Sequence, residues 1–563
     1  MDSPEATREV AQRKLLERVA EQLESKTRKD PQSGRTLGGL LGTLREGFKY
    51  AQVGARSASF GPMVAFPPAN PLLEKVAERA QDNILRVIRQ VHFDPKTNET
   101  IDLVFTVKGI PVVTMELKTD STQSVAHARK QYREDRVPSP ARRLLQPGRA
   151  LVHFAVSNAE VYMTTALKGS DTFFLPFNRG VNGGAGNPPI PGKSETSYLW
   201  EEVLERDTFL RILRDFAVWE PDAKPKRGTP GGKLIFPRYH QLRAVERVTR
   251  RGAGGRYLIE HSAGSGKTKT IAWLSRCLIR HVDKDGQKTF DSVIVVTDRT
   301  ALDTNVRQDM QMMDASMGLV VSVGENAGAK SPQLRQAIEE GDHIITCTLQ
   351  TFPHVLKLLE NEQDLAGRRW CVIADEAHSS QTGSSATALR ELLTDVELDE
   401  GEEYTADDLL ELRQEAIAVA EHMTFVALTA TPKGKPLRLF GTETPDGHFV
   451  AFDTYPMGQA IEEGLHPRRA RQLFDLPDVG RSPRRTGKTR GSRRDRSSHR
   501  HGALRPPTPN LHRAESGGRH RTLPPQRRPP PGRPGPCDGC HILQKGRSPL
   551  VGRDEPLHPV QWL

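Results

Sequence analysis

The sequence contains no run of about 18 consecutive apolar residues, so it offers no segment long enough to cross a membrane as a helix. Its first residues, MDSPEATREVAQRKLLERVAEQ, are charged and typical of a helix rather than of a secretory signal. Cysteine is scarce, with 5 residues in 563, which provides no disulfide framework and favours a reducing compartment. These absences predict a cytoplasmic protein with no membrane partner.

Most of the chain has no net positive charge, and the positive charge of the protein is concentrated in its last part. Residues 465–563 hold 20 Arg and 2 Lys against 7 acidic residues, a net of +15, which leaves −4 for residues 1–464. They also hold 16 of the 41 prolines, which predicts a disordered Arg/Pro-rich tail. Two interpretations stay open: a basic tail that grips nucleic acid, or out-of-frame translation of a GC-rich coding sequence. The abrupt change in mid-domain favours the second.

The most informative stretch is residues 261–268, with the sequence HSAGSGKT, between a short apolar run and a helical segment. Such a loop presents backbone N–H groups at a helix N-terminus, where they can cradle phosphates. The Lys267 ammonium can reach the outer phosphates and the Thr268 hydroxyl can ligate Mg²⁺. His261 stands where the strict pattern has glycine, so the match is partial. The residues predicted to bind ATP here are Gly264, Ser265, Gly266, Lys267 and Thr268.

Several later apolar runs end in polar residues, as buried parallel strands do where they feed a loop. The run 370–374 delivers Asp375 and Glu376 to the sheet edge at which the phosphate loop also lies. Asp375 can hold Mg²⁺ and Glu376 can polarise the attacking water. Gln241 is placed to hydrogen-bond an adenine edge. Strands alternating with helices predict an α/β fold with a doubly wound parallel sheet.

A second candidate site lies in the first half of the chain. Residues 100–107 and 110–118 are typical of a hairpin that turns at Lys108 and Gly109. Pairing of its strands can bring Asp102 beside Glu116 and Lys118, which share a face. Two carboxylates can hold Mg²⁺, and an adjacent ammonium can orient water and stabilise charge on a phosphate. The alternative is that the three charges are solvated decoration of a hairpin.

Helical and linker patterns surround these sites. Residues 125–136 are typical of a helix with a basic face, which could reach phosphates or simply be exposed. His153 alternates within an apolar strand and is interpreted as a core residue. One helix is expected over 197–218, followed by a linker at 220–232. The residues of the basic helix that could reach phosphates are His127, Arg129, Lys130, Gln131, Tyr132 and Arg133.

The ordered set Gln241, AGSGKT, TDR, TLQTF, DEAH and TAT resembles the first RecA-like domain of a superfamily 2 helicase or translocase. The spacing of Asp102, Glu116 and Lys118 matches the PD-(D/E)xK nuclease core. Together with the phrases IPVVTMELKTD, FPRYHQL and VIVVTDRTALD, these motifs make residues 40–464 resemble the HsdR restriction subunit of type I restriction-modification enzymes.

The resemblance implies ATP-driven translocation and cleavage of double-stranded DNA, in a complex with specificity and methyltransferase subunits. It implies cleavage by Asp102, Glu116 and Lys118, and coupling of ATP to DNA through Thr429 and Thr431. The family often has a glutamine and a tyrosine four apart in the helix after the lysine, whereas here Tyr132 follows Gln131 directly. A free-standing repair nuclease-helicase and a catalytically inactive DNA-binding remnant are the alternative interpretations.

The same resemblance predicts the domain organisation. The family pattern is lost just after residue 464, so the second RecA-like domain that would close the ATP site is not recognised and weak motor activity is expected. The predicted segments are an N-terminal helix at 1–36, a PD-(D/E)xK endonuclease domain at 37–219, a linker at 220–232, a RecA-like ATP-binding domain at 233–464 and the tail at 465–563.

Overall fold

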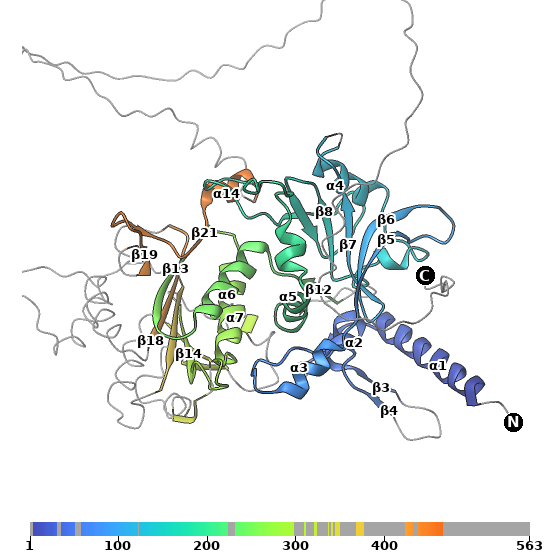
Figure 1. The fold of residues 1–563 in the computed structure, drawn as a ribbon, viewed down its shortest axis with the longest axis horizontal. Coiled ribbons are helices and arrows are strands. Elements are labelled where there is room, and N and C mark those ends of the chain that lie inside the picture. Colours follow the sequence, from blue (N-terminus) through green and yellow to red (C-terminus); the bar gives the residue numbers. More distant parts are fainter. Residues whose placement is uncertain are drawn as a thin grey trace, which may run out of the picture. The chain divides into compact units, whose positions relative to one another are not determined.

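The computed structural model describes residues 4–30, 35–50, 58–121, 123–222 and 231–297, short stretches between 309 and 375, and most of 423–465. The predicted tail after Leu465, and Glu376, lie outside the described residues. Within the described part the fold is mixed α/β with two main sheets (Figure 1). No helix of that part is long and apolar enough to cross a membrane.

The chain begins with a helix, α1 (Pro4–Glu24), that packs against the short helix α2 (Gly39–Glu46). The helix expected at 1–36 therefore ends at Glu24. Two two-stranded ladders and a third helix complete this segment. The ladders pair β1 (Arg28–Lys29) with β2 (Thr36–Leu37) and β3 (Phe48–Tyr50) with β4 (Ala58–Phe60), and the helix is α3 (Glu74–Gln81).

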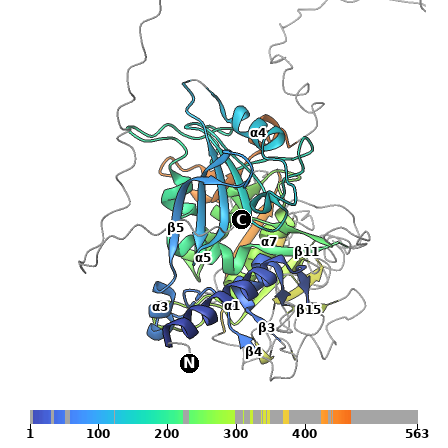
Figure 2. The same cartoon turned by 90° about the vertical axis from the view of Figure 1, so that its right-hand side faces the viewer.

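A six-stranded sheet, called the N-terminal sheet below, follows in the order β10-β9-β8-β7-β6-β5. Figure 2 labels its edge strand β5. Its pairs are antiparallel except β7 with β8, which are joined by helix α4 (Val125–Glu134). The predicted hairpin is confirmed, and both turn residues have positive φ, 49° at Lys108 and 81° at Gly109. The strands are β5 (Leu85–His92), β6 (Thr100–Val107), β7 (Ile110–Leu117), β8 (Val152–Val156), β9 (Val161–Thr164) and β10 (Leu175–Pro176).

The prediction of one helix over 197–218 is wrong. The segment divides into η2 (Leu199–Val203), α5 (Arg206–Arg211) and η3 (Ile212–Phe216). The break has a local cause: Glu205 is extended, and its carboxylate accepts hydrogen bonds from the backbone of Asp207 and Thr208, which starts a new helix. The chain then forms β11 (Val218–Pro221), which pairs with β12 (Gly232–Ile235) across the expected linker.

The second main sheet has seven strands, all parallel, in the order β15-β16-β14-β17-β18-β13-β21. Its central strands are buried along their length, which explains their unbroken apolar runs. Helix α6 (Tyr239–Arg251) packs on α7 (Lys267–Ile279), and α7 packs on the sheet (Figure 1). The strands are β13 (Gly255–His261), β14 (Ser292–Thr297), β15 (Val320–Val323), β16 (Ile344–Thr348), β17 (Trp370–Asp375), β18 (Met423–Thr429) and β21 (Asp453–Tyr455).

The parallel sheet is thus confirmed, whereas its doubly wound character stays a prediction. The remaining described elements after β18 are a small ladder of β19 (Thr442–Glu443) with β20 (Phe449–Val450), and helix α14 (Met457–Glu462). One hydrophobic core cluster contains residues of both main sheets. Phe154 of β8 packs edge-on against Phe236, and the Trp273 indole of α7 donates a hydrogen bond to the Phe216 carbonyl at 3.1 Å.

Candidate functional site

The structure brings Asp102 and Glu116 together at one end of the β6–β7 hairpin. The strand register pairs Leu103 with Met115, which sets Asp102 beside Glu116. The Leu117 backbone N–H donates a hydrogen bond to Asp102 Oδ2 at 2.8 Å. Glu116 is fully buried. The two residues are called the carboxylate pair below, and their spacing in the sequence was a sufficient guide to it.

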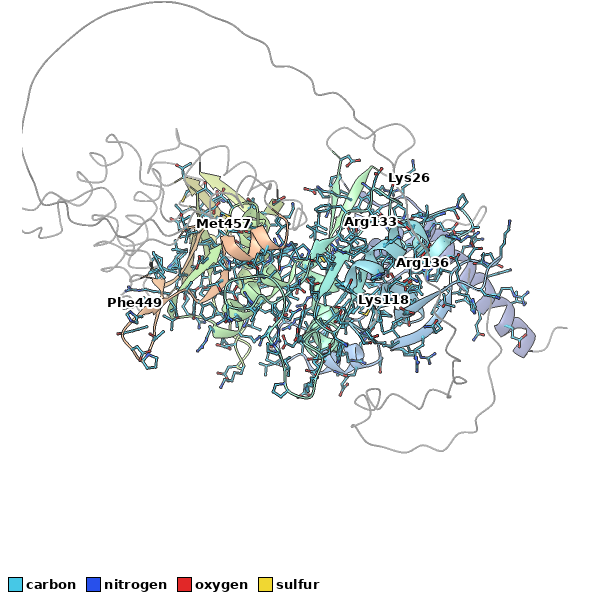
Figure 3. The ribbon with its side chains drawn as sticks, turned by 90° about the horizontal axis from the view of Figure 1, so that it is seen from above. Lys26, Lys118, Arg133, Arg136, Phe449 and Met457 are labelled. Carbon is cyan, nitrogen blue, oxygen red and sulfur yellow. The ribbon has the colours of Figure 1, made fainter. Side chains whose placement is uncertain are left out.

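Lys118 follows β7 directly and is partly exposed. Its backbone N–H donates to the Val156 carbonyl at 2.9 Å, which fixes the chain at the end of β7. No hydrogen bond joins its ammonium to either carboxylate among the described residues. Figure 3 labels Lys118 together with Arg136, which comes from the segment after α4.

Glu116 has a cationic partner that the sequence did not reveal. Arg136 Nε donates to Glu116 Oε1 at 2.9 Å, while Glu116 Oε2 is buried without a hydrogen-bond partner. Burial raises the pKa of Glu116 to about 7, against a lowering effect of Arg136 and with a raising contribution from Asp102. No local pattern marks Arg136, because its partner lies 20 positions earlier.

The carboxylate pair fits a hard divalent cation. Glu116 Oε2 accepts no hydrogen bond from a donor among the described residues and lies within hydrogen-bonding range of the Asp102 carboxylate, so a bound cation, or a proton shared by the two carboxylates, would satisfy it. Mg²⁺ commonly takes one or two protein carboxylates and completes its shell with water and substrate phosphate. The described residues contain no group of three His, Cys, Asp or Glu that could hold a metal. At this site the described residues therefore offer a cation two carboxylate ligands, Asp102 and Glu116.

Helix α4 packs on β7, β8 and β9, and its basic residues differ in exposure: Lys130 is exposed and lies 3.6 Å from Glu134, whereas two arginines contact groups of the same chain. Arg129 lies over the Tyr162 ring, and Arg133 Nε donates to the Thr172 carbonyl at 3.0 Å. His127 caps the helix at Ser124. Gln131 Oε1 is buried without a hydrogen-bond partner.

Tyr132 and His153 form a buried polar chain beneath Glu116. The Tyr132 hydroxyl lies 2.8 Å from Thr114 Oγ1, which lies 2.7 Å from His153 Nδ1. Burial lowers the pKa of His153 to about 3, so its imidazole is neutral near pH 7. The expectation that His153 is a core residue is confirmed.

The loop 261–268, called the phosphate loop below, joins β13 to α7. Gly264 and Gly266 have φ of 72° and 90°, and the helix begins at Lys267 directly after Gly266. The φ of Gly266 favours glycine, and a Cβ there would lie 2.7 Å from Gln241 Nε2 and displace that amide. Lys267 Nζ lies 3.4 Å from the His261 carbonyl oxygen. The loop thus presents its amides and the Lys267 ammonium at a helix N-terminus, as predicted for an anion site.

Gln241 supports this loop from α6. Its Nε2 donates to the Gly266 carbonyl at 3.1 Å, and its Oε1 accepts from the Arg238 backbone N–H at 3.0 Å. Gln241 is buried and both ends of its amide are engaged within the chain, so its contact with adenine stays a prediction. His240 also contacts the loop, with Nε2 3.1 Å from the Ser265 carbonyl oxygen.

His261, which departs from the strict motif, is fully buried. Its Nε2 lies 3.3 Å from Asp453 Oδ1 of β21, and Asp453 also accepts hydrogen bonds from Arg243 and Arg247. Burial lowers the pKa of His261, so the ring is a neutral member of this network. The side chain therefore anchors the loop to a strand that sequence patterns did not predict.

Asp375 lies at the same edge of the parallel sheet as the phosphate loop. The registers pair Asp375 with Leu428, and Thr429 with Glu260, so the ends of β17, β18 and β13 coincide. With one strand between them, the ends of β17 and β13 are about 10 Å apart. The Thr431 backbone N–H donates to Thr429 Oγ1 at 3.2 Å.

Comparison with known proteins gives a family match for each of two regions of the chain. Residues 240–466 match the family of the SWI2/SNF2 ATPase, which defines the second part of the chain as a helicase-like ATPase domain and implies nucleotide binding. Residues 73–172 match the N terminus of the type I restriction enzyme R protein. The chain is therefore an HsdR-like protein with a helicase-like domain.

A search of the curated proteins finds no match. Two solved structures with similar parts are a DEAD box protein from the hyperthermophile Methanococcus jannaschii and T4 UvsW, each 14% identical to this chain. The similarity to the DEAD box protein has a TM-score of 0.24 and covers 36% of this chain and 45% of the DEAD box protein chain. The similarity to T4 UvsW has a TM-score of 0.25 and covers 42% of this chain and 38% of the UvsW chain. The chain spans less than half of either structure.

Proposed function

We propose that this chain is the restriction subunit of a type I restriction-modification system, which cleaves double-stranded DNA and translocates it at the expense of ATP. The observation that carries the nuclease half is the orphan oxygen of Glu116 beside Asp102. In this proposal Asp102 and Glu116 hold Mg²⁺, which polarises the scissile phosphate when bound. Lys118 orients the attacking water and stabilises charge on the phosphate.

The ATPase half rests on the phosphate loop and the shared sheet edge. Gly264, Ser265 and Gly266 supply backbone amides, and Lys267 supplies the charge to the phosphates. Thr268 and Asp375 hold Mg²⁺ when it is bound with ATP, Gln241 reads adenine, and Glu376 orients water. Specificity and methyltransferase subunits are the partners of this proposal, which leaves selection of the DNA sequence to them.

The nuclease assignment is tested with Asp102→Ala in the full chain. The variant should lose Mg²⁺-dependent cleavage of plasmid DNA while retaining its circular dichroism spectrum, because a divalent-metal site loses one of its two carboxylates. Asp171→Ala, at an exposed position outside both sites, is the matched control. Undiminished nicking by Asp102→Ala would reject the assignment.

Lys267→Ala and the exposed control Lys284→Ala test the ATPase half in the same preparations. Loss of the phosphate-binding charge should lower DNA-stimulated ATP hydrolysis by about 100-fold or more. Dependence of cleavage on a neighbouring methyltransferase and specificity protein would separate the restriction subunit from a free-standing repair nuclease. End-dependent cleavage by the chain alone would favour the repair enzyme.

A further inference from the structure

We propose that Arg136 and Gln90 are positioning residues that orient Glu116 and Asp102, so that the Glu116 Oε2 atom stays open beside the Asp102 carboxylate. This inference rests on the proposed nuclease function and names the groups that prepare its metal site. Neither residue belongs to the Asp102, Glu116 and Lys118 set, and neither has to touch DNA or metal to act.

Arg136 is held so firmly that it can define where Glu116 points. The side chain is 8% exposed, and its guanidinium lies over the Phe93 ring at 5.0 Å. Its Nη2 donates to the Thr100 carbonyl at 2.9 Å, and its Nη1 lies 3.4 Å from Glu99 Oε1. Only Nε is directed at Glu116, and it engages Oε1 alone. A planar guanidinium fixed at three places therefore positions one oxygen and leaves the other free.

Gln90 does the corresponding work for Asp102 from the edge strand β5. Its φ is 50°, in the left-handed region that favours glycine. The register pairs the residues on either side of it, Arg89 with Leu103 and Val91 with Ile101, so the distortion is confined to Gln90. A strained residue that faces a proposed metal ligand is the kind of feature retained for function.

The orientation of the Gln90 amide is set by a neighbour on β6. The Thr100 hydroxyl donates to Gln90 Oε1 at 2.6 Å, which turns Nε2 toward Asp102 Oδ1 at 3.1 Å. Asp102 Oδ2 accepts from the Leu117 backbone. Each carboxylate thus accepts a hydrogen bond from outside the pair, Glu116 from the buried Arg136 and Asp102 from the exposed Gln90, whose amide is oriented by Thr100.

These two hydrogen bonds explain how the Asp102 and Glu116 carboxylates stay side by side although both can carry negative charge. Glu116 and Asp102 lie side by side on paired strands, and repulsion between two ionised carboxylates would turn them apart. Arg136, which donates to Glu116 Oε1, and Gln90, which donates to Asp102 Oδ1, oppose that rotation. A divalent cation then meets a preformed pair instead of having to assemble it, which raises affinity without adding a ligand.

The test is Mn²⁺ binding to the full chain, measured by calorimetry, beside the Mg²⁺ concentration that gives half-maximal cleavage. Asp102→Ala defines binding at this site. Arg136→Met and Gln90→Met should each weaken Mn²⁺ binding and raise the Mg²⁺ requirement by about 10-fold or more, the usual effect of losing an orienting partner. Arg136→Lys should bind Mn²⁺ more tightly than Arg136→Met but less tightly than the wild type, because lysine keeps the positive charge but lacks the planar guanidinium.

Arg133→Met is the matched control, since Arg133 lies on α4 and donates to the Thr172 carbonyl, away from both carboxylates. It should lower the melting temperature without changing the metal dependence. Unchanged Mn²⁺ affinity in both methionine variants, or an equal loss in Arg133→Met, would overturn the inference. Wild-type Mn²⁺ binding that Asp102→Ala removes, without any DNA cleavage, would instead reject the nuclease and leave the positioning role standing.

Discussion

His153 shows how one buried side chain ties the stability of this protein to pH. Its pKa falls from 6.5 to about 3 in the folded chain because burial disfavours the imidazolium. The unfolded chain therefore takes up a proton below pH 6.5 that the folded chain refuses. The contribution of His153 to stability is complete above pH 6.5 and is lost progressively as the pH falls from 6.5 toward 3.

We predict that His153→Gln will flatten the acid side of the stability profile. Between pH 7.5 and pH 5 this one group should cost the wild type about 2 kcal/mol. The glutamine variant should start lower at pH 7.5, because the packing around Thr114 changes, but lose less on acidification. Urea unfolding at both pH values measures the difference, and parallel losses in the two proteins would contradict it.

Residues that act through local spacing were predictable, whereas those that act through long-range contacts were not. Asp102 and Glu116 were found because a hairpin fixes which residues face each other, and this holds in the register. Arg136 and Gln90 were missed, since nothing near them in the sequence reveals their partners. His261 was recognised only as a departure from a motif, and its partner Asp453 lies 192 positions away.

At the scale of elements, strands were predicted well because their patterns are local. Alternation identified β5, β6 and β7, and unbroken apolar runs identified β14, β17 and β18. The helix over 197–218 was overextended because a glutamate in mid-pattern gives no sign that it caps a new helix. Strand β21 has only three residues and exists through its pairing with β13, which no local pattern encodes.

Helix α14 and the glycine-rich loop between β10 and η2 form one packing unit. The Ala185 backbone N–H donates to Glu462 Oε2 at 2.7 Å, and Gly180 lies against Gln459. A Cβ on Gly180 would approach the Gln459 amide oxygen to 2.2 Å. The glycines Gly180 and Gly184 of this loop therefore allow close packing against a helix.

This packing predicts different effects for two matched glycine substitutions. Gly180 and Gly148 both have φ of 81°, but a Cβ on Gly148 would meet nothing within 4 Å. Gly148→Ala should cost only backbone strain, about 1 kcal/mol, whereas Gly180→Ala should cost about 1–3 kcal/mol more by displacing Gln459. Thermal unfolding of the two variants gives the comparison. Equal destabilisation would show that the loop does not pack on α14 as described.

On the scale of the whole described molecule, both proposed sites depend on one hydrophobic core. The cluster that contains Phe154 of the N-terminal sheet also contains Trp273 of α7 and Val293 of the parallel sheet. Sequence patterns predicted the parallel sheet, a hairpin of the N-terminal sheet and a linker between them, but they could not reveal that β11 and β12 pair across that linker. The apolar faces that join the two parts look the same in sequence as faces buried within either one.

A continuous core should transmit a defect at its junction into both sheets. Trp273 is 1% exposed, packs against Phe216, and donates its indole N–H to the Phe216 carbonyl. Trp273→Ala should therefore lower the free energy of unfolding by about 3–5 kcal/mol, the usual range for losing a buried aromatic side chain. Hydrogen exchange should accelerate in β8 as well as in β14, because the two strands contribute to the same cluster.

Trp200→Ala is the control for this prediction, since Trp200 is 43% exposed and its loss removes little buried surface. Exchange measured by mass spectrometry on peptides covering Val152–Val156 and Ser292–Thr297 reports on each sheet separately. Faster exchange confined to Ser292–Thr297 in Trp273→Ala would mean that the two sheets unfold independently. Faster exchange in both peptides would instead show that the sheet carrying the carboxylate pair and the sheet carrying the phosphate loop unfold together. A substitution that destabilises one sheet would then also destabilise the other.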